Sequence, residues 1–447
     1  MKQQTRILVA LFAIGLLAAW GSLFGSSQSL HFDDERLKRI NAHYQAAIDK
    51  QTVAGIRALI VQNDRTVYER NFGYRDLAGQ KPVTDDTIFH IYSMTKPITS
   101  VAVMILFEEG KLLLHEPIAK YIPELANLKV YDPVNGKGNP PVRKAARQPT
   151  VNDVLTHRAG FTYGLFDRSA LGTMYREAGI GAPTTDLQDL VEELGKLPLA
   201  FDPGTKWHYS VSTDVLGRLV EAVSGQKFGT FLKQRIFTPL KMTDTSFRFD
   251  ADKADRMAVL YSREGIPADF EKNGYYAKPT GPGLEPAHRA LLFGYTDQGV
   301  FESGGAGLLS TTTDYLQFAK MLLNRGELDG VRILSPNSID MMRHDQVGNT
   351  PPTARLTNIM LNDGIGFGLG FGTIKNQALS GLALPTGSYF WGGAAGTFFW
   401  VDPQNDLIGL FMTQLVPHRT TLRQDMWGLT YQAIGDNRVN PQDLFQP

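Results

Sequence analysis

Hydrophobic and polar positions along the chain follow two periods, one typical of helices and one typical of strands. In residues 32–50, apolar side chains recur at helical spacing with charged residues between them, which predicts an amphipathic helix. Further helices are predicted at residues 151–155, 186–194, 213–223, 228–236 and 422–434. Residues 58–68 and 397–412 each contain two apolar runs around a polar turn, which predicts two β-hairpins.

These elements predict an α+β fold. Strands are expected near both ends of the chain and helices dominate the region between them. We therefore expect one antiparallel sheet built from both chain termini, flanked by helices, with an inserted and mostly helical subdomain. The predicted sheet region comprises residues 32–111 and 296–436, and the predicted insert comprises residues 112–295. Together they are expected to form one domain.

Two segments have unusual patterns. Residues 250–294 combine Gly, Pro and charged residues without sustained periodicity, and long irregular segments of this kind often line pockets. In residues 364–372 glycine occupies every second position, which predicts one strand with a bare face. The glycines never fit the G-x-G-x-x-G spacing, so the run does not indicate a dinucleotide site.

Residues 1–25 are expected to lie outside the folded domain. Lys2 and Arg6 precede an apolar run that begins at Ile7, and the small residues Ala19 and Gly21 suit cleavage by a signal peptidase. The run over residues 7–24 is also nearly long enough to cross a bilayer. The segment therefore predicts either a cleaved signal peptide or an uncleaved inner-membrane anchor. In both cases the protein is expected to be exported, periplasmic or secreted.

Composition excludes several kinds of chemistry. The chain of 447 residues has no cysteine, which excludes disulfides, thiolate metal sites, iron–sulfur clusters, a cysteine nucleophile and a lipoprotein anchor. Its 45 Lys and Arg balance 45 Asp and Glu, so no net field favours nucleic acid. The nine histidines show no metal-binding spacing. We expect no metal, no cofactor, no nucleic-acid partner and no obligate protein partner.

A Ser-x-x-Lys motif, which can pair a nucleophile with a base, occurs twice. Ser224 and Lys227 follow a predicted helix, and Gly225 between them suits a helix C-cap, so this copy is interpreted as a connector. Ser93 and Lys96 precede a long apolar helix and share its N-terminal face, where the helix dipole stabilises developing negative charge. A neighbouring base can activate the weakly nucleophilic hydroxyl. The alternative is that Ser93 caps the helix and Lys96 is a solvated lysine.

Five motifs in a fixed order place Ser93 in a wider context. They are residues 93–96 (SMTK), 156–160 (THRAG), 201–210 (FDPGTKWHYS), 304–311 (GGAGLLST) and 391–397 (WGGAAGT). In order and spacing they resemble the serine β-lactamase-like superfamily, and within it the class C-type branch that contains the family VIII carboxylesterases. The resemblance spans about residues 37–434, and the fold of that superfamily agrees with the expected α+β layout.

The resemblance implies a set of catalytic residues. Ser93 would be the acylated nucleophile, Lys96 its proton-relay partner, and Tyr209 the tyrosine that shares the role of general base. A phenol with an unperturbed pKa of about 10 is a poor base at neutral pH unless an ammonium stabilises the phenolate, so Lys96 and Tyr209 form one coupled unit. The backbone N–H groups of Ser93 and Ala394 would form the oxyanion hole. His208 is interpreted as structural.

Two positions depart from the pattern of β-lactamases and D,D-peptidases. Trp391 stands where those enzymes have a Lys or His that binds the substrate carboxylate, and an indole cannot replace a cation. Val211 ends the tyrosine motif, which usually ends in Asn. Both departures favour a neutral ester that binds against Trp391, Gly392 and Gly393. The two glycines would let the substrate approach the strand closely, and the alternative is a packing role.

The leading hypothesis is therefore one catalytic domain that acts as an exported serine hydrolase. It would be a carboxylesterase that cleaves small neutral carboxylic esters through an acyl-enzyme on Ser93. One alternative is a β-lactamase, or an amidohydrolase of the D,D-peptidase or D-aminopeptidase type, that tolerates Trp391. Another is a non-catalytic scaffold with the same fold, which the intact set of Ser93, Lys96 and Tyr209 disfavours.

Overall fold

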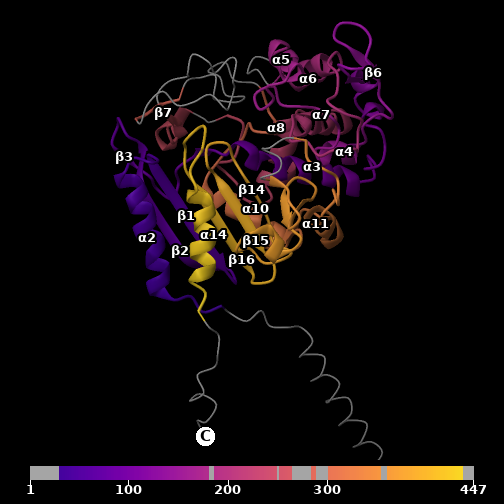
Figure 1. The fold of residues 1–447 in the computed structure, drawn as a ribbon. Helices are drawn as coiled ribbons and strands as arrows, with labels where there is room; N and C mark the ends of the chain where they lie inside the picture. Colours follow the sequence, from indigo (N-terminus) through magenta and orange to yellow (C-terminus); the bar gives the residue numbers. More distant parts are fainter. Residues whose placement is uncertain are drawn as a thin grey trace, which may run out of the picture.

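A single large antiparallel sheet organises the fold (Figure 1). The computed structural model describes residues 30–180, 186–248, 251–263, 283–287, 301–353 and 360–435. The sheet's N-terminal strands are β1 (Gly55–Gln62), β2 (Arg65–Asp76) and β3 (Lys81–Pro82). Its C-terminal strands are β12 (Ile365–Phe367), β13 (Gly372–Ile374), β14 (Tyr389–Gly392), β15 (Phe398–Asp402) and β16 (Leu407–Met412). Their order is β12-β13-β14-β15-β16-β1-β2-β3, so the two ends of the chain meet where β1 pairs with β16.

Both faces of the central strands are covered, which explains their continuous apolar sequences. Along β16, Leu407 and Phe411 join one buried cluster, whereas Ile408, Leu410 and Met412 join the cluster on the opposite face. Side chains of a strand alternate between faces, so a strand covered on both sides is apolar throughout. The predicted hairpins at residues 58–68 and 397–412 are confirmed as β1–β2 and β15–β16.

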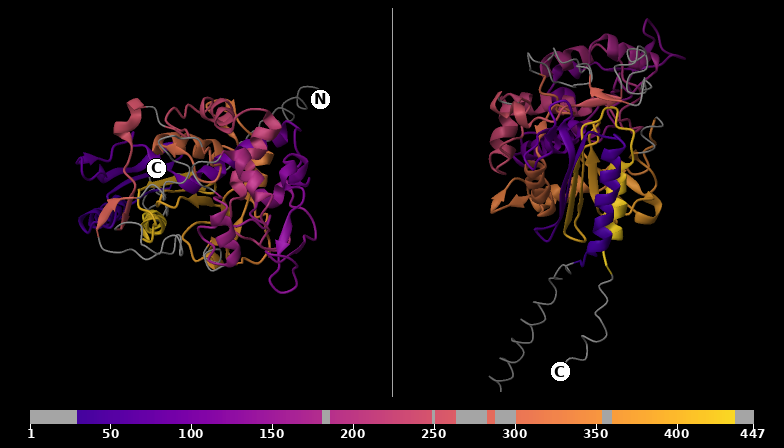
Figure 2. Two further views of the ribbon diagram at one scale, coloured as in Figure 1. Left: turned by 90° about the horizontal axis from the view of Figure 1, so that it is seen from above. Right: turned by 90° about the vertical axis from the view of Figure 1, so that its left-hand side faces the viewer.

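Two helices from opposite ends of the chain cover one face of the sheet. They are α2 (Asp34–Asp49) and α14 (Leu422–Gln432), which Figures 1 and 2 show side by side. The hydroxyl of Tyr44 donates to the carbonyl of Leu422 at 3.1 Å and joins them. Asp33 caps α2 by accepting hydrogen bonds from two backbone N–H groups of the first turn. The predicted helices at residues 32–50 and 422–434 are thus confirmed, with ends shifted by one or two residues.

Most of the other helices gather on the other face and at one end of the sheet (Figure 1). They are α3 (Thr95–Glu108), α4 (Val151–Leu155), α5 (Ala170–Glu177), α6 (Leu187–Leu194), α7 (Ser212–Ser224), α8 (Phe228–Leu232), α10 (Thr312–Leu323) and α11 (Pro336–Arg343). The short helix α13 (Gln377–Ser380) is different, because Leu382 just after it packs against the same buried cluster as α2 and α14. Short turns are η1 (Tyr92–Met94), η2 (Ile118–Lys120), η3 (Pro123–Leu125), η5 (Ala251–Arg256) and a π-helical turn, η4 (Lys233–Phe237). The predicted helices at 151–155, 186–194 and 213–223 are confirmed, whereas 228–236 is α8 continued by the π-helical turn.

Short strand pairs complete the described part of the chain. They are β4 (Phe89–His90) with β9 (Leu309–Ser310), β5 (Lys129–Tyr131) with β6 (Val142–Lys144), β7 (Tyr261–Arg263) with β8 (Leu284–Pro286), and β10 (Glu327–Leu328) with β11 (Val331–Arg332). The β4–β9 pair joins the segment just before α3 to the segment just before α10.

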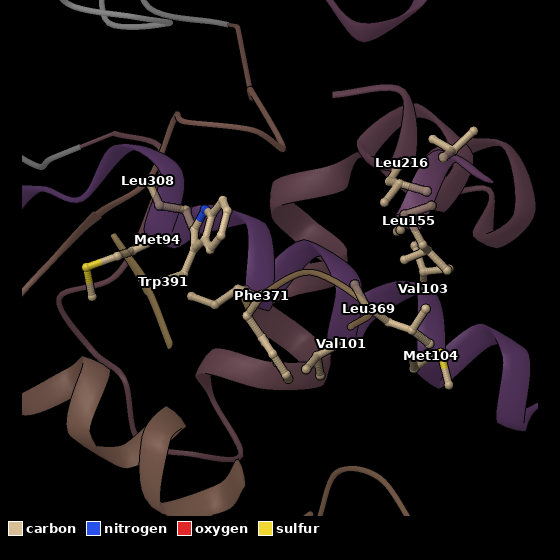
Figure 3. Close-up of a cluster of buried hydrophobic side chains, with 14 of the residues drawn as sticks. Met94, Val101, Val103, Met104, Leu155, Leu216, Leu308, Leu369, Phe371 and Trp391 are labelled. Atoms are coloured by element: carbon tan, nitrogen blue, oxygen red, sulfur yellow. The ribbon is translucent and has the colours of Figure 1, made fainter. Parts of the chain in front are cut away.

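Helix α3 runs through the largest buried cluster and fixes the position of its own first turn. All its residues from Thr95 to Leu106 are buried. Figure 3 shows Met94 and Trp391 at one end of this cluster and Leu155 with Leu216, from α4 and α7, at the other. A helix buried on every side cannot shift without opening cavities, so the start of α3 is a rigid platform.

The glycine-rich run is not the single strand that its pattern predicts. Ile365–Phe367 and Gly372–Ile374 are separate strands that pair antiparallel, and the chain turns between them. Gly370 lies in that turn with φ of 105°, a conformation open mainly to glycine, and the side chain of Ser100 leaves no room for a Cβ there. Period-two alternation cannot reveal such a turn, because a turn built from glycine and apolar residues preserves the alternation.

Two sequence predictions fall largely outside the described residues. The predicted signal or anchor, residues 1–25, lies entirely outside them. Of the irregular stretch at residues 250–294, only residues 251–263 and 283–287 are described, and they form η5 and the β7–β8 pair. Within the described ranges, none of the helices has the length and hydropathy needed to cross a bilayer.

Candidate active site

Ser93 lies in the tight turn η1 directly before α3. Tyr92, just ahead of the serine, adopts φ of 46°, which bulky residues rarely do. The hydroxyl of Tyr315 donates to the carbonyl of Met94 at 2.9 Å and holds the turn from the α10 side. Ser93 makes no capping hydrogen bond, since Met94 is the N-cap residue of α3. The alternative that Ser93 is a helix cap is therefore wrong.

Lys96 is completely buried, with three hydrogen-bond acceptors around its ammonium group. Its Nζ lies 2.6 Å from the carbonyl oxygen of Gly305, 3.2 Å from the hydroxyl of Tyr163 and 3.3 Å from Oγ of Ser93. An ammonium has three donors, so this environment satisfies all of them. The alternative of a solvated surface lysine is wrong.

Tyr209 approaches Ser93 from the helical region. Its hydroxyl lies 2.7 Å from Oγ of Ser93, and Nζ of Lys96 sits 4.7 Å from the centre of its ring. A cation at this distance from an aromatic ring is attracted to the face of the ring. The structure thus brings the three predicted catalytic side chains into mutual contact.

His157 holds the segment that carries Tyr209. The N–H of Ser210 donates to Nδ1 of His157 at 3.3 Å, and the N–H of His208 donates to the carbonyl of His157 at 2.9 Å. The rings of His157 and Tyr209 lie 4.8 Å apart. Burial, and then the charge of Lys96, lower the pKa of His157 well below its usual range, so the imidazole stays neutral and its Nδ1 can accept.

Sequence reasoning missed two residues beside Lys96, the partly buried Tyr163 and the buried Asp214. The hydroxyl of Tyr163 accepts from Lys96 and donates to Oδ2 of Asp214, at 3.5 Å. Asp214 also accepts from the hydroxyl of Ser303 and from the N–H of Gly305. The resulting chain of contacts runs from Ser93 through Lys96 and Tyr163 to a buried carboxyl group.

The carboxyl group of Asp214 makes Tyr163 and Tyr209 chemically different. Burial, followed by the charge of Asp214, raises the pKa of Tyr163 well above its usual range. Burial also raises the pKa of Asp214, although nearby Lys96 opposes that shift. Tyr163 therefore keeps its proton and cannot accept one from Ser93. The hydroxyl of Tyr209 contacts Ser93 and has no carboxylate partner among the described residues.

No local sequence pattern indicates that Tyr163 and Asp214 belong to the site. Tyr163 lies in an irregular segment after the THRAG motif, and Asp214 lies in the first turn of α7, where an acidic residue is ordinary. The only sequence signal is the glycine motif at residues 304–311, which contains Gly305 and suggested no specific role.

The predicted oxyanion-hole residues line the same cavity as the reactive side chains. Ser93 and Ala394 both border a cavity of about 280 Å³. Gly393, just past the end of β14, donates to the carbonyl of Thr397 at 2.7 Å, which fixes the backbone leading into Ala394. Across the described part of the chain, neither the N–H of Ser93 nor that of Ala394 donates to a protein acceptor, so both can receive an oxyanion.

The described wall of the cavity is largely apolar but contains a cation that the sequence did not predict. Its apolar lining is Phe166, Met360, Ile365, Leu382, Phe390, Trp391, Phe398 and Trp427. Trp391 also packs against the ring of Tyr209, with centres 5.7 Å apart. Arg423, in the first turn of α14, lines the cavity and places Nη1 3.5 Å from the carbonyl of Gly393. No acidic side chain occurs in the described lining.

Packing explains the two glycines of the last motif. A Cβ on Gly393 would collide with the side chain of Thr397, and one on Gly392 would lie 2.9 Å from the ring of Phe398. The packing alternative therefore accounts for both positions, although both still line the cavity.

The second Ser-x-x-Lys motif and His208 make structural contacts. Gly225 ends α7 in the left-handed conformation with φ of 71°, so the second Ser-x-x-Lys is a connector, as predicted. His208 contacts the hydroxyl of Thr162 at 2.9 Å, which fits a structural role. Among residues whose placement is described, no three His, Asp or Glu gather closely enough to hold a metal ion.

Comparison with known proteins places the chain in one family. The family model described as Beta-lactamase matches residues 40–427. Protein Rv1367c of Mycobacterium tuberculosis is 32% identical over 383 residues, which cover 84% of this chain and 89% of that protein. Esterase EstB of Burkholderia gladioli is 28% identical over 380 residues, with the same two coverages of 84% and 89%. The solved structure of EstCE1, a hydrolase with promiscuous acyltransferase activity, matches with a TM-score of 0.71 at 24% identity and covers 89% of this chain and 99% of its own. The resemblance seen in the sequence motifs is thereby confirmed.

Proposed function

The chain belongs to the beta-lactamase family, and from this premise we propose that it is a carboxylesterase that forms an acyl-enzyme on Ser93. The observation that carries the proposal is the contact of Oγ of Ser93 with two proton-handling groups, the hydroxyl of Tyr209 at 2.7 Å and Nζ of Lys96 at 3.3 Å. A serine hydroxyl needs such a base to become a nucleophile.

The reaction would proceed in two halves. In the first, the proton of Ser93 passes to the Tyr209–Lys96 pair while Oγ attacks the ester carbonyl, and the alcohol leaves with a proton returned by the pair. In the second, the pair takes a proton from water, which attacks the acyl-enzyme. The bond to Oγ breaks, the acid is released, and the pair returns the proton to Oγ of Ser93. The N–H groups of Ser93 and Ala394 would bind the oxyanion in both halves.

Two features of the cavity support an ester as substrate. β-Lactamases have a cation at the position that binds the substrate carboxylate, whereas this chain has Trp391 there. Most of the described lining of the cavity is also apolar. The relative EstB is an esterase, which agrees with this choice. An apolar pocket with few polar groups suits the uncharged groups of a carboxylic ester.

One observation favours a second candidate, a β-lactamase or D,D-peptidase-type activity. The guanidinium of Arg423 beside Gly393 supplies a cation close to the strand on which such substrates would lie. A guanidinium binds a carboxylate well. Nitrocefin and p-nitrophenyl butyrate, tested side by side, decide between the two candidates: faster turnover of nitrocefin would replace the esterase proposal.

The nucleophile can be tested with a matched pair of variants. Ser93→Ala should abolish both hydrolysis of p-nitrophenyl butyrate and labelling by a fluorophosphonate probe. Ser224→Ala, which alters the other Ser-x-x-Lys, should retain both, because that serine lies at the end of α7. Full activity in Ser93→Ala would refute the mechanism, and absence of labelling in the unmodified protein would favour the non-catalytic scaffold.

A further inference from the structure

Two neighbouring cavities share one wall. The cavity that contains Ser93 measures about 280 Å³, and a second cavity of about 430 Å³ lies beside α14. Leu382, Gln424 and Trp427 line both, so these three residues lie at the boundary between the two spaces. We refer to them as the partition.

Trp427 is the fixed part of the partition. Its side chain is buried, and its ring packs edge to face against Phe390 and Phe398, with centres 5.3 Å and 4.7 Å apart. Both phenylalanines line the cavity of Ser93. A buried ring packed in this way has little room to change rotamer, so the indole is a fixed part of the cavity wall.

The other two members of the partition are less constrained. Gln424 lies one turn before Trp427 on the same helix and is exposed, and Leu382 lies just after α13 and is half-buried. Residues three apart on a helix share a face, which is why Gln424 and Trp427 can form one wall.

The second cavity offers a mixed surface. Ala383 and Leu429 contribute apolar area, while His43 of α2 contacts Oδ2 of Asp425 at 2.9 Å. The hydroxyl of Thr421 also donates to Asp425, so the one carboxylate among the described lining residues is already satisfied. An apolar chain could therefore extend into the second cavity while the carboxylate of Asp425 keeps its hydrogen-bond partners.

We propose that the partition sets the length of the apolar group that the enzyme accepts, and that the second cavity is a subsite for longer chains once the partition is opened. The proposal rests on the esterase function proposed above and names its substrate class as esters whose apolar group ends at Trp427. That group could belong to the acyl or to the alcohol half of the ester, and the experiment distinguishes the two.

The experiment compares two ester series on purified variants. One series varies the acyl chain of p-nitrophenyl esters, and the other varies the alcohol of alkyl butyrates. In Trp427→Ala, kcat/KM for long chains relative to short chains should rise by about tenfold or more in one series, because each newly buried methylene adds roughly fourfold. The series that responds identifies the half of the ester that points at the partition.

Two further variants protect the test against misfolding, since Trp427→Ala removes a buried ring. Leu382→Ala and Gln424→Ala open the partition from its less constrained side and should shift the same ratio in the same direction by a smaller factor. Leu379→Ala is the matched control for Leu382→Ala: it lies three residues away, is 59% exposed and lines neither cavity, so its profile should equal that of the unmodified enzyme.

The outcomes separate the two proposals. If short esters are cleaved but neither series shifts in any partition variant, the partition proposal is wrong and the esterase proposal stands. If the unmodified protein cleaves no ester, or if Ser93→Ala remains active, the esterase proposal itself fails. A shift in Leu379→Ala equal to that in Leu382→Ala would also overturn the role of the partition.

Discussion

Single residues decide which of two neighbouring tyrosines can act as a base. Tyr163 and Tyr209 both contact Lys96, one through its hydroxyl and one through the face of its ring. The hydroxyl of Tyr163 is committed to Asp214, whereas the hydroxyl of Tyr209 reaches Ser93. The sequence identified Tyr209 through its motif but could not find Tyr163 or Asp214, because no spacing rule connects them to Lys96.

This difference predicts unequal effects of removing the two hydroxyl groups. Tyr209→Phe should lower kcat by on the order of a hundredfold to ten-thousandfold, the usual contribution of a general base. Tyr163→Phe should cost less, about tenfold, because Lys96 keeps its contacts with Gly305 and Ser93. Steady-state kinetics with one short ester measures both effects. A larger loss in Tyr163→Phe than in Tyr209→Phe would reverse the assignment of the base.

At the scale of elements, prediction succeeded where one local signal is enough. The helix at α2 follows from amphipathic spacing and the cap Asp33, and the hairpins follow from apolar runs around polar turns. It failed at the glycine run, where a turn preserved the alternation of the strands. It also missed the turn η1, where Tyr92 adopts φ of 46° and Tyr315 of the distant helix α10 donates to the carbonyl of Met94, since neither feature has a local sequence signal.

The short helix α4 offers a test of how one element supports the site. Thr150 and Asp153 form a reciprocal capping box at its start, and the helix leads directly into His157. Thr150→Ala should lower the free energy of unfolding by about 1 kcal/mol, as loss of an N-cap usually does. Thr150→Ser keeps the capping hydroxyl and should be close to neutral. Urea denaturation of the two variants provides the measurement, and equal stability would show that the cap contributes nothing.

At the scale of the whole molecule, the candidate site depends on the two ends of the chain sharing one sheet. Ser93 follows the N-terminal strands, Ala394 follows β14, and Tyr209 comes from the helical region, yet all three line one cavity. The motifs predicted this set because their order resembles a known family. The partition between the cavities could not be predicted, since it is made by α14 and the segment after α13, whose sequences carry no motif.

The fold also buries histidines, and this predicts how stability depends on pH. Burial, together with the charge of Arg423, lowers the pKa of His418 to about 3, and the pKa of His157 is likewise lowered well below its usual range. Once unfolded, each would titrate near the ordinary value of about 6.5 and bind a proton that the folded state does not bind. The free energy of unfolding should therefore fall below about pH 6.5, by roughly 1.4 kcal/mol per pH unit for each histidine.

Urea denaturation between pH 7.5 and 5 tests this pH dependence with a matched pair of variants. His418→Gln should reduce the slope of stability against pH, because one of the titrating groups is gone. His115→Gln, which alters an exposed histidine, should leave the slope as it is in the unmodified protein. The slope is the informative quantity, since His418 contacts the hydroxyl of Thr420 at 3.0 Å and its loss also lowers stability at every pH. An unchanged slope in His418→Gln would mean that His418 takes up a proton in the folded protein.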